Sequence, residues 1–358
     1  MAARILVKVQ VKFDGTNFND ISAYTRRVSI KYGRERLIED AFQAGACTIE
    51  LDNTGGEFTP GHTGASYGDS QLINREVRIS SEVVGGSDSY ATYLWRGFIT
   101  DANYVAEQST STVYLTSVDG FSRLASASIY NQTFSEEYTG IRVANVLDLA
   151  SVDYPDESSP LDRDIDYGSI KASAASGVTA TALDYIQQLA RTENGRFLIN
   201  QAGTPSATNF GGIASYYAVN ASTVDHGVTI SDAVTLATGS VEAQSLGLEW
   251  GSELLYNSYE FTPKSGAVQT GTRAASIAKY GERVIKRTLL SDTGDSDEAG
   301  LYFIGLFDEP ALRVSSVVVS IDSATTLTAE KLLHLQCMSA MDLSYLPPGS
   351  SVTLNSAL

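Results

Sequence analysis

A serine between two glycines is the first feature of this sequence that could carry chemistry. Gly64, Ser66 and Gly68 fit the pattern G-x-S-x-G, in which hydrolases present a nucleophilic serine. That turn requires a buried strand directly before the serine and a helix directly after it. Here the preceding residues are TPGHT and the following residues are DSQLI, and neither segment has the pattern of such an element. We therefore predict that Ser66 lies in a surface loop and is not catalytic.

The segment 292–294 (DTG) imitates the active-site turn of aspartic proteases. Those enzymes need two carboxylates that share one proton, and so two copies of the motif or a symmetric dimer. This sequence has one copy, and the acidic side chains that follow it would add repulsion without apolar shielding. We predict instead that Asp292 belongs to the acidic start of a helix, where the helix dipole favours negative charge.

Metal and cofactor sites have no support in the sequence. The acidic segments 292–298 and 153–166 lack the spacing of an EF-hand loop, and no P-loop or G-x-G-x-x-G segment is present. Three histidines and two cysteines share no zinc-ligand spacing. These residues are His62, His226, His334, Cys47 and Cys337. We therefore predict no catalytic residue, no metal and no cofactor, and we expect the cysteines to be buried free thiols of a reducing compartment.

Tyrosine is the most numerous aromatic residue, with 19 copies beside 12 Phe and 2 Trp. Tyr216 with Tyr217, or Tyr90 with Tyr93, could form a platform for a sugar ring. Tyrosines are also common in half-buried strands and at subunit contacts, because the ring tolerates one wet edge. We favour this second interpretation.

The charge of the chain restricts its partners. Lys and Arg total 25 against 42 for Asp and Glu, which gives a net charge of −17. Binding to nucleic acid by counterion release needs a basic face, so such binding is disfavoured. An acidic surface would let nucleic acid pass without sticking, although high charge also serves plain solubility. No apolar run approaches the roughly 20 residues of a membrane helix.

Strand patterns dominate residues 1–125. Short alternating apolar segments, such as 46–51 (ACTIEL), are separated by clusters of Gly, Asn, Asp and Ser. Segments 93–99 and 112–118 are joined by a polar connection, which is a hairpin signal. This organisation predicts an antiparallel sandwich or barrel.

In the middle of the chain, the apolar residues recur at the spacing of a helix and no longer at that of a strand. Residues 139–150 carry Val143 and Leu147 on one helical face, and a second helix is predicted to start near Thr181. An acidic, proline-bearing loop is expected at 153–166 between them. The segment 196–200 (RFLIN) is predicted to be a strand.

The last third of the chain contains patterns of both strands and helices. The strand expected at 312–321 (LRVSSVVVSI) is the strongest in the chain, and short helices are expected on either side of it. With 358 residues the chain is long enough for two or three domains. We predict a β-rich α+β protein. Its expected domains are an N-terminal β-barrel-like domain at 1–128, a mixed α/β middle domain at 129–245, and a second barrel-like domain with short helices at 246–358.

Several segments, in order, resemble the minor tail proteins of long-tailed bacteriophages, the tail-tip hub proteins. The matching segments are 20–30 (DISAYTRRVSI), 32–34 (YGR), 42–53 (FQAGACTIELDN), 56–60 (GEFTP), 94–101 (LWRGFITD), 182–199, 280–283 (YGER) and 309–314 (EPALRV). Each is weak alone, but together they span about residues 20 to 320 in the expected order.

The resemblance implies two β-barrel or sandwich domains related to the tail-tube fold, with an inserted middle domain. It also implies a baseplate-hub-like ring in the virion, most often a homotrimer. The ring would join the tail tube to the distal tip and leave a channel through which DNA passes without specific binding. Expected partners are the distal tail or tail tube protein, the tape measure protein, and tail fibre or receptor-binding proteins.

Two alternatives remain open at this point. One is the distal tail protein, a hexameric ring, and the other is a carbohydrate-binding receptor module of the tail tip. Exposed contact loops are expected around 60–70 and 153–166. If the acidic loop lines the channel, Asp162, Asp164 and Asp166 would repel the passing DNA.

Overall fold

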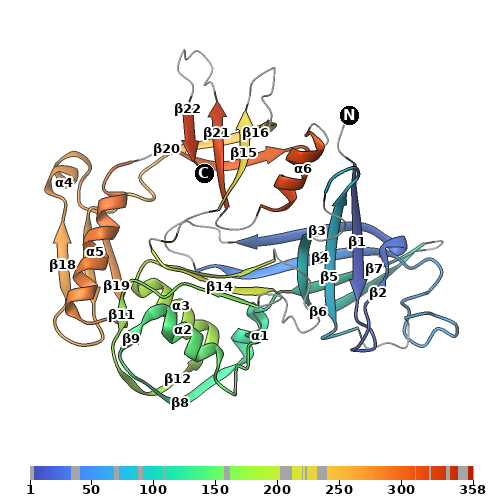
Figure 1. Ribbon diagram of the computed structural model, residues 1–358, viewed down its shortest axis with the longest axis horizontal. Helices are drawn as coiled ribbons and strands as arrows, with labels where there is room; N and C mark the ends of the chain where they lie inside the picture. Colours follow the sequence, from blue (N-terminus) through green and yellow to red (C-terminus); the bar gives the residue numbers. More distant parts are fainter. Residues whose placement is uncertain are drawn as a thin grey trace.

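The structure is β-rich, with several sheets and six α-helices among the residues that it describes (Figure 1). The computed structural model describes residues 4–33, 41–67, 72–87, 92–107, 110–156, 162–201, 212–219, 221, 224–231, 240–310, 312–321, 324–335, 339–345 and 354–357. Within them, no helix combines the length and the apolar character needed to cross a membrane. The predicted β-rich α+β class is confirmed.

The first sheet is antiparallel and has seven strands in the order β2-β1-β5-β6-β7-β4-β3. Its strands are β1 Ile5–Val11, β2 Asn19–Asp20, β3 Thr25–Gly33, β4 Gln43–Asp52, β5 Glu76–Val83, β6 Thr92–Ala106 and β7 Ser111–Val118, with the 3-10 turn η1 at Ser22–Tyr24. The alternation predicted at 46–51 sends Cys47, Ile49 and Leu51 into one core, around the buried Trp95. The described strands leave this sheet open at β2 and β3, so the expected barrel is not closed.

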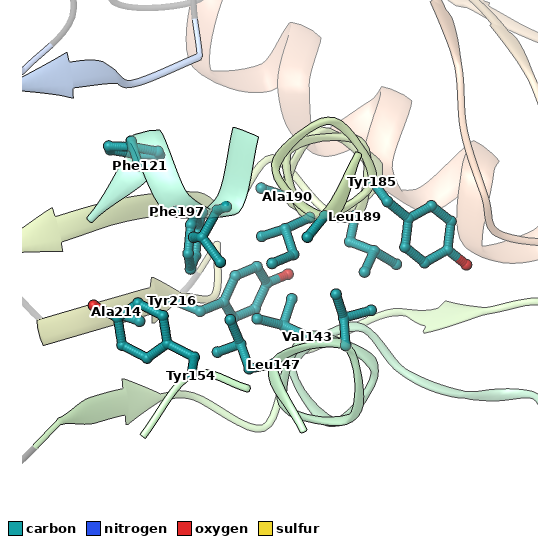
Figure 2. Packing of buried hydrophobic residues seen from close by; sticks show 14 of the residues in the cluster. Phe121, Val143, Leu147, Tyr154, Tyr185, Leu189, Ala190, Phe197, Ala214 and Tyr216 are labelled. Atoms are coloured by element: carbon teal, nitrogen blue, oxygen red, sulfur yellow. The ribbon is translucent and has the colours of Figure 1, made fainter. Parts of the chain in front are cut away.

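The middle unit packs three helices against short sheets. It contains α1 Phe121–Ser126, β8 Ser128–Phe134, β9 Glu137–Tyr138, α2 Thr139–Leu147, β10 Arg163–Ile165, β11 Lys171–Ala172, β12 Ala175–Thr181, α3 Ala182–Thr192, β13 Arg196–Asn200 and β14 Ile213–Tyr217. The helix predicted near Thr181 is confirmed, since the Thr181 side chain accepts a hydrogen bond from Asp184 N over 3.1 Å. Figure 2 shows Val143 and Leu147 of α2 facing Leu189 of α3.

The acidic segment 153–166 is not a simple loop. Residues 163–165 form strand β10, which pairs in parallel with β14 and so joins the sheet β10-β14-β13. The sequence hid this strand because a partner about 50 residues away supplies its hydrogen bonds.

The second large sheet has the order β20-β16-β15-β21-β22. Its strands are β15 Val224–Ser231, β16 Ser240–Trp250, β20 Leu312–Val319, β21 Ser339–Tyr345 and β22 Leu354–Ala357. Helix α6 (Thr326–Leu333) contacts both β15 and β5, and Val83 of β5 shares a core with Val228 of β15. The expected domain boundary at 245/246 lies inside β16, and the three domain limits stay a prediction.

A further unit is inserted between β16 and β20. It holds β17 Ser258–Thr262, β18 Gln269–Thr272, α4 Ala274–Tyr280, β19 Val284–Thr288 and α5 Thr293–Phe307, with the sheet order β18-β17-β19. Helix α5 lies against this sheet, and Ile304 and Phe261 are fully buried between them. Gly300 permits the close approach, because a Cβ there would lie 2.3 Å from the Tyr259 ring.

Candidate assembly surfaces

Ser66 and Asp292, the central residues of the two enzyme-like motifs, make local contacts in the structure. Ser66 is exposed in a turn, and its backbone N–H donates to the Glu57 carboxylate over 2.9 Å. Asp292 caps the N-terminus of α5, with its side chain accepting from Asp295 N over 3.0 Å. Both residues therefore have local structural roles in the described part of the chain.

The tyrosines proposed as a sugar platform do not share an open face. Tyr216 is fully buried and donates its hydroxyl to Glu193 over 2.9 Å, whereas Tyr217 is half-buried and contacts Asn200. Tyr93 is also buried, and Tyr90 lies outside the described residues. Burial of Tyr216 raises the pKa of its hydroxyl well above the usual value. The three described tyrosines of this set therefore form no platform for a sugar ring.

Asp162, Asp164 and Asp166 of the acidic loop do not lie together on one surface. Asp162 is fully buried, and its charge acts on the buried Arg96. Asp164 is exposed and lies 3.3 Å from the Tyr217 hydroxyl, while Asp166 accepts the N–H of Ala218 over 2.9 Å. The expectation that all three line a surface is therefore wrong for Asp162.

The candidate metal ligands are scattered. No group of three His, Cys, Asp or Glu side chains in the described residues could hold a metal ion. His62 is exposed, and His334 is the C-cap residue of α6. The structure does not describe the side chain of His226. Cys47 is buried as predicted, and burial raises the pKa of its thiol to about 12. Cys337 lies outside the described residues.

Two long strands, β3 and β20, lie at the edges of their sheets. In the described residues β3 pairs only with β4, and β20 pairs only with β16. An unpaired edge offers a row of N–H and C=O groups to a strand of another chain. These edges are the candidate assembly surfaces.

The two edges differ in their side chains. Strand β3 exposes Arg26, Arg27 and Lys31, and such charges discourage pairing with another edge. Strand β20 exposes Val318 by 50%, and its first residue is opposite Trp250 of β16, which is 71% exposed. Large exposed apolar side chains at an edge are typical of a protein interface.

Sequence reasoning identified β20 as a strand but not as an edge. The valine-rich segment equally fits a buried central strand, because both contain runs of apolar β-branched residues. An edge strand differs from a central strand in how many neighbouring strands pair with it, and those neighbours come from distant segments of the chain.

Comparison with solved structures identifies the fold. A tail protein from Neisseria meningitidis MC58 superposes with a TM-score of 0.58 at 8% identity, over 98% of this chain and 89% of the other. The fold is that of phage tail proteins. Prophage tail protein gp18 from Listeria monocytogenes EGD-e matches with a TM-score of 0.50 at 8% identity, over 98% of this chain and 88% of the other.

A third tail protein, the 43 kDa protein of prophage MuSo2 from Shewanella oneidensis, gives a TM-score of 0.46 at 14% identity over 83% of this chain and 77% of the other. No protein-family model matches the sequence, and no curated protein matches it either. The resemblance to tail proteins seen in the sequence segments is confirmed at the level of the fold by the matches with TM-scores of 0.58 and 0.50.

Proposed function

We propose that this protein is a structural component of a bacteriophage tail tip, a hub that forms a ring between the tail tube and the distal tip. The observation that carries this proposal is the fold likeness over 98% of the chain to a tail protein. One further feature supports it, namely the sheet edges at β3 and β20, where each strand pairs with a single neighbour among the described residues.

The edges suggest how the ring is built. Each copy carries two large sheets, so three copies would present six sheets to a six-fold tube. Pairing or packing at β20 would cover Val318 and Trp250, which are costly to leave in water. A closed ring has no free edge left at that position, and closure therefore limits the assembly to a defined number of copies.

The acidic surface suits a channel for DNA. A wall with the same charge sign as the phosphate backbone repels the DNA and does not retain it. The net charge of −17 favours this behaviour. Of the three aspartates first considered, the exposed Asp164 remains a candidate for the wall.

Electron microscopy of the purified protein, classified by symmetry, tests the proposal. We expect a three-fold ring with a central hole, and antibody label at the tail tip of intact virions. A six-fold ring would move the assignment to the distal tail protein. If neither a ring nor tail labelling is found, the proposal is wrong.

A further inference from the structure

A cleft with an unusual charge separates the middle unit from the inserted unit. Its walls are the end of α3 and the start of β13 on one side, and β19 and the second half of α5 on the other. Helix α5 and strand β19 lie at the left of Figure 1. Its volume is about 480 Å³, which lies in the range of pockets that hold a ligand or several side chains.

The described lining of the cleft has four cations and no carboxylate. The cations are Arg191, Arg196, Lys286 and Arg287. This composition contrasts with a chain in which acidic residues exceed basic residues by 17. A concave site with one sign of charge concentrates the electric field, so it attracts a group of opposite sign.

The cations are held in different ways. Arg287 is oriented by a 2.5 Å hydrogen bond to the Asn194 side chain, and its guanidinium lies 4.7 Å from the centre of the Phe303 ring. Lys286 pairs with Glu260 over 2.6 Å. Arg191 is exposed on the last turn of α3, at the rim of the cleft.

Exposed apolar side chains border the cations. Val284, Tyr302 and Leu306 line the same cleft and are 41%, 45% and 57% exposed. Arginine beside aromatic and aliphatic side chains is typical of the centre of protein interfaces. A partner for this cleft should therefore offer carboxylates together with apolar side chains on a narrow element.

The hairpin of β6 and β7 has this chemistry. Near its tip Tyr104 and Val105 are 37% and 40% exposed and Glu107 is exposed next to them, while the exposed Asp101 lies farther from the tip, opposite Thr116 of β7. Residues 97–122 contain no Lys or Arg. The hairpin is therefore acidic and apolar where the cleft is basic and apolar.

One copy cannot place its own hairpin in its own cleft. Phe42 lines the cleft and directly precedes β4, while Thr112 near the hairpin tip is opposite Asp52 at the other end of that strand. Strand β4 has 10 residues, which corresponds to about 33 Å. The hairpin tip and the cleft thus lie at opposite ends of β4, and only a second copy can join them.

We propose that the cleft of one copy receives the β6–β7 hairpin of a second copy. Glu107 and Asp101 would approach the arginines, and Val105 would cover the exposed apolar wall, while Tyr104 points to the opposite face of β6. Such a head-to-tail contact uses two different surfaces of each copy, and it closes into a ring when the rotation between copies permits. This contact specifies an interface of the ring proposed above, and it rests on that proposal.

Charge reversal tests the contact. Arg191→Glu and Glu107→Arg are made singly and together, and self-association is measured by light scattering across protein concentration, with chemical cross-linking mapped by mass spectrometry. Each single reversal should weaken association by about tenfold or more, and the chain with both reversals should recover it. Lys279→Glu is the matched control, because this exposed lysine lies outside the cleft and pairs with Glu309. It should leave association unchanged.

The sequence dictates one more control. Glu39 and Asp40 directly precede the cleft residue Ala41, so Glu39→Gln with Asp40→Asn is included. We expect association to stay equal or to become tighter, because the cleft cations attract the carboxylates of the second copy's hairpin.

The outcomes separate the two proposals. If the wild type forms a ring that neither reversal weakens, or if Glu39→Gln with Asp40→Asn abolishes association, the hairpin contact is wrong and the hub assignment stands. If the wild type shows no self-association and no cross-link between hairpin and cleft, the contact is again overturned, and labelling of virions decides the hub assignment separately.

Discussion

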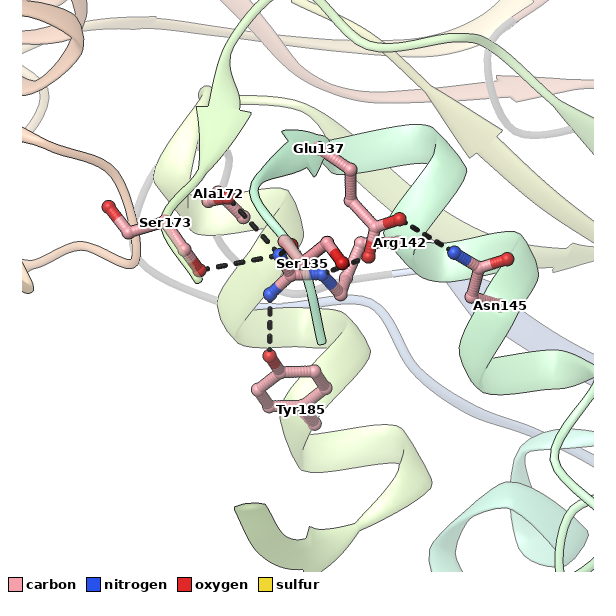
Figure 3. A network of polar contacts seen from close by, with 7 residues as sticks. All are labelled: Ser135, Glu137, Arg142, Asn145, Ala172, Ser173 and Tyr185. Atoms are coloured by element: carbon pink, nitrogen blue, oxygen red, sulfur yellow. Dashed lines mark hydrogen bonds and ion pairs between the residues drawn. The ribbon is translucent and has the colours of Figure 1, made fainter. Parts of the chain in front are cut away.

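Arg142 allows the sharpest test of what holds the middle unit together. Its side chain is fully buried, and Nε donates to the Glu137 carboxylate over 2.5 Å while Nη1 donates to the Tyr185 hydroxyl over 3.0 Å (Figure 3). Nη2 donates to the carbonyl oxygens of Ala172, over 3.1 Å, and of Ser135. The guanidinium of Arg142 thus connects α2 to α3, to the segment before α2 at Ser135 and to strand β11 at Ala172.

The substitution Arg142→Met keeps much of the side-chain volume and removes every donor. It leaves the Glu137 carboxylate, whose side chain is only 15% exposed, without its cation, together with buried carbonyl oxygens that lose their partner. Breaking one partner of a buried ion pair costs about 3–5 kcal/mol, because the remaining charge stays desolvated. We therefore expect the free energy of unfolding of this unit to fall by about 3–5 kcal/mol.

Urea denaturation followed by circular dichroism measures this loss, and hydrogen exchange of the α2 amides assigns the transition to the middle unit. Tyr185→Phe, which removes one of these contacts, should cost about 1 kcal/mol. Glu137→Gln combined with Arg142→Met should cost less than the sum of the single changes, since no unpaired charge remains. A loss below about 1 kcal/mol for Arg142→Met would refute the reasoning.

Three further predictions concern other parts of the fold. Burial raises the pKa of Asp119 to about 7 from an ordinary value of 3.8. Its contribution to stability is therefore full below about pH 4 and is lost as the pH rises through 7. Asp119→Asn should reduce this dependence of the unfolding free energy on pH, as measured by urea denaturation at several pH values. Gly300→Ala should destabilise the protein by about 1–3 kcal/mol in thermal melts because its Cβ meets Tyr259, whereas Gly294→Ala on the same helix, with its nearest neighbour at 3.6 Å, should not destabilise it. Cys47, whose thiol pKa burial raises to about 12, should resist iodoacetamide at pH 8 in the folded state and react after unfolding, as read from its own peptide by mass spectrometry.

Local patterns in the sequence predicted many elements correctly. The alternation at 46–51 specified which face of β4 is buried, because successive side chains of a strand point to opposite sides. Thr181 specified the start of α3, because its hydroxyl satisfies a backbone N–H that the helix leaves free. Both signals act within a few residues and need no distant partner.

The sequence by itself therefore determined the β-rich α+β fold class and the acidic character of the chain. Only the tertiary structure decided that β20 lies at an edge, that Asp162 is buried, and that Arg191 and Arg287 share one cleft. These properties depend on which segments pack together across a separation of tens to hundreds of residues. Burial and pairing are properties of such contacts, and a residue type or a short spacing does not contain them.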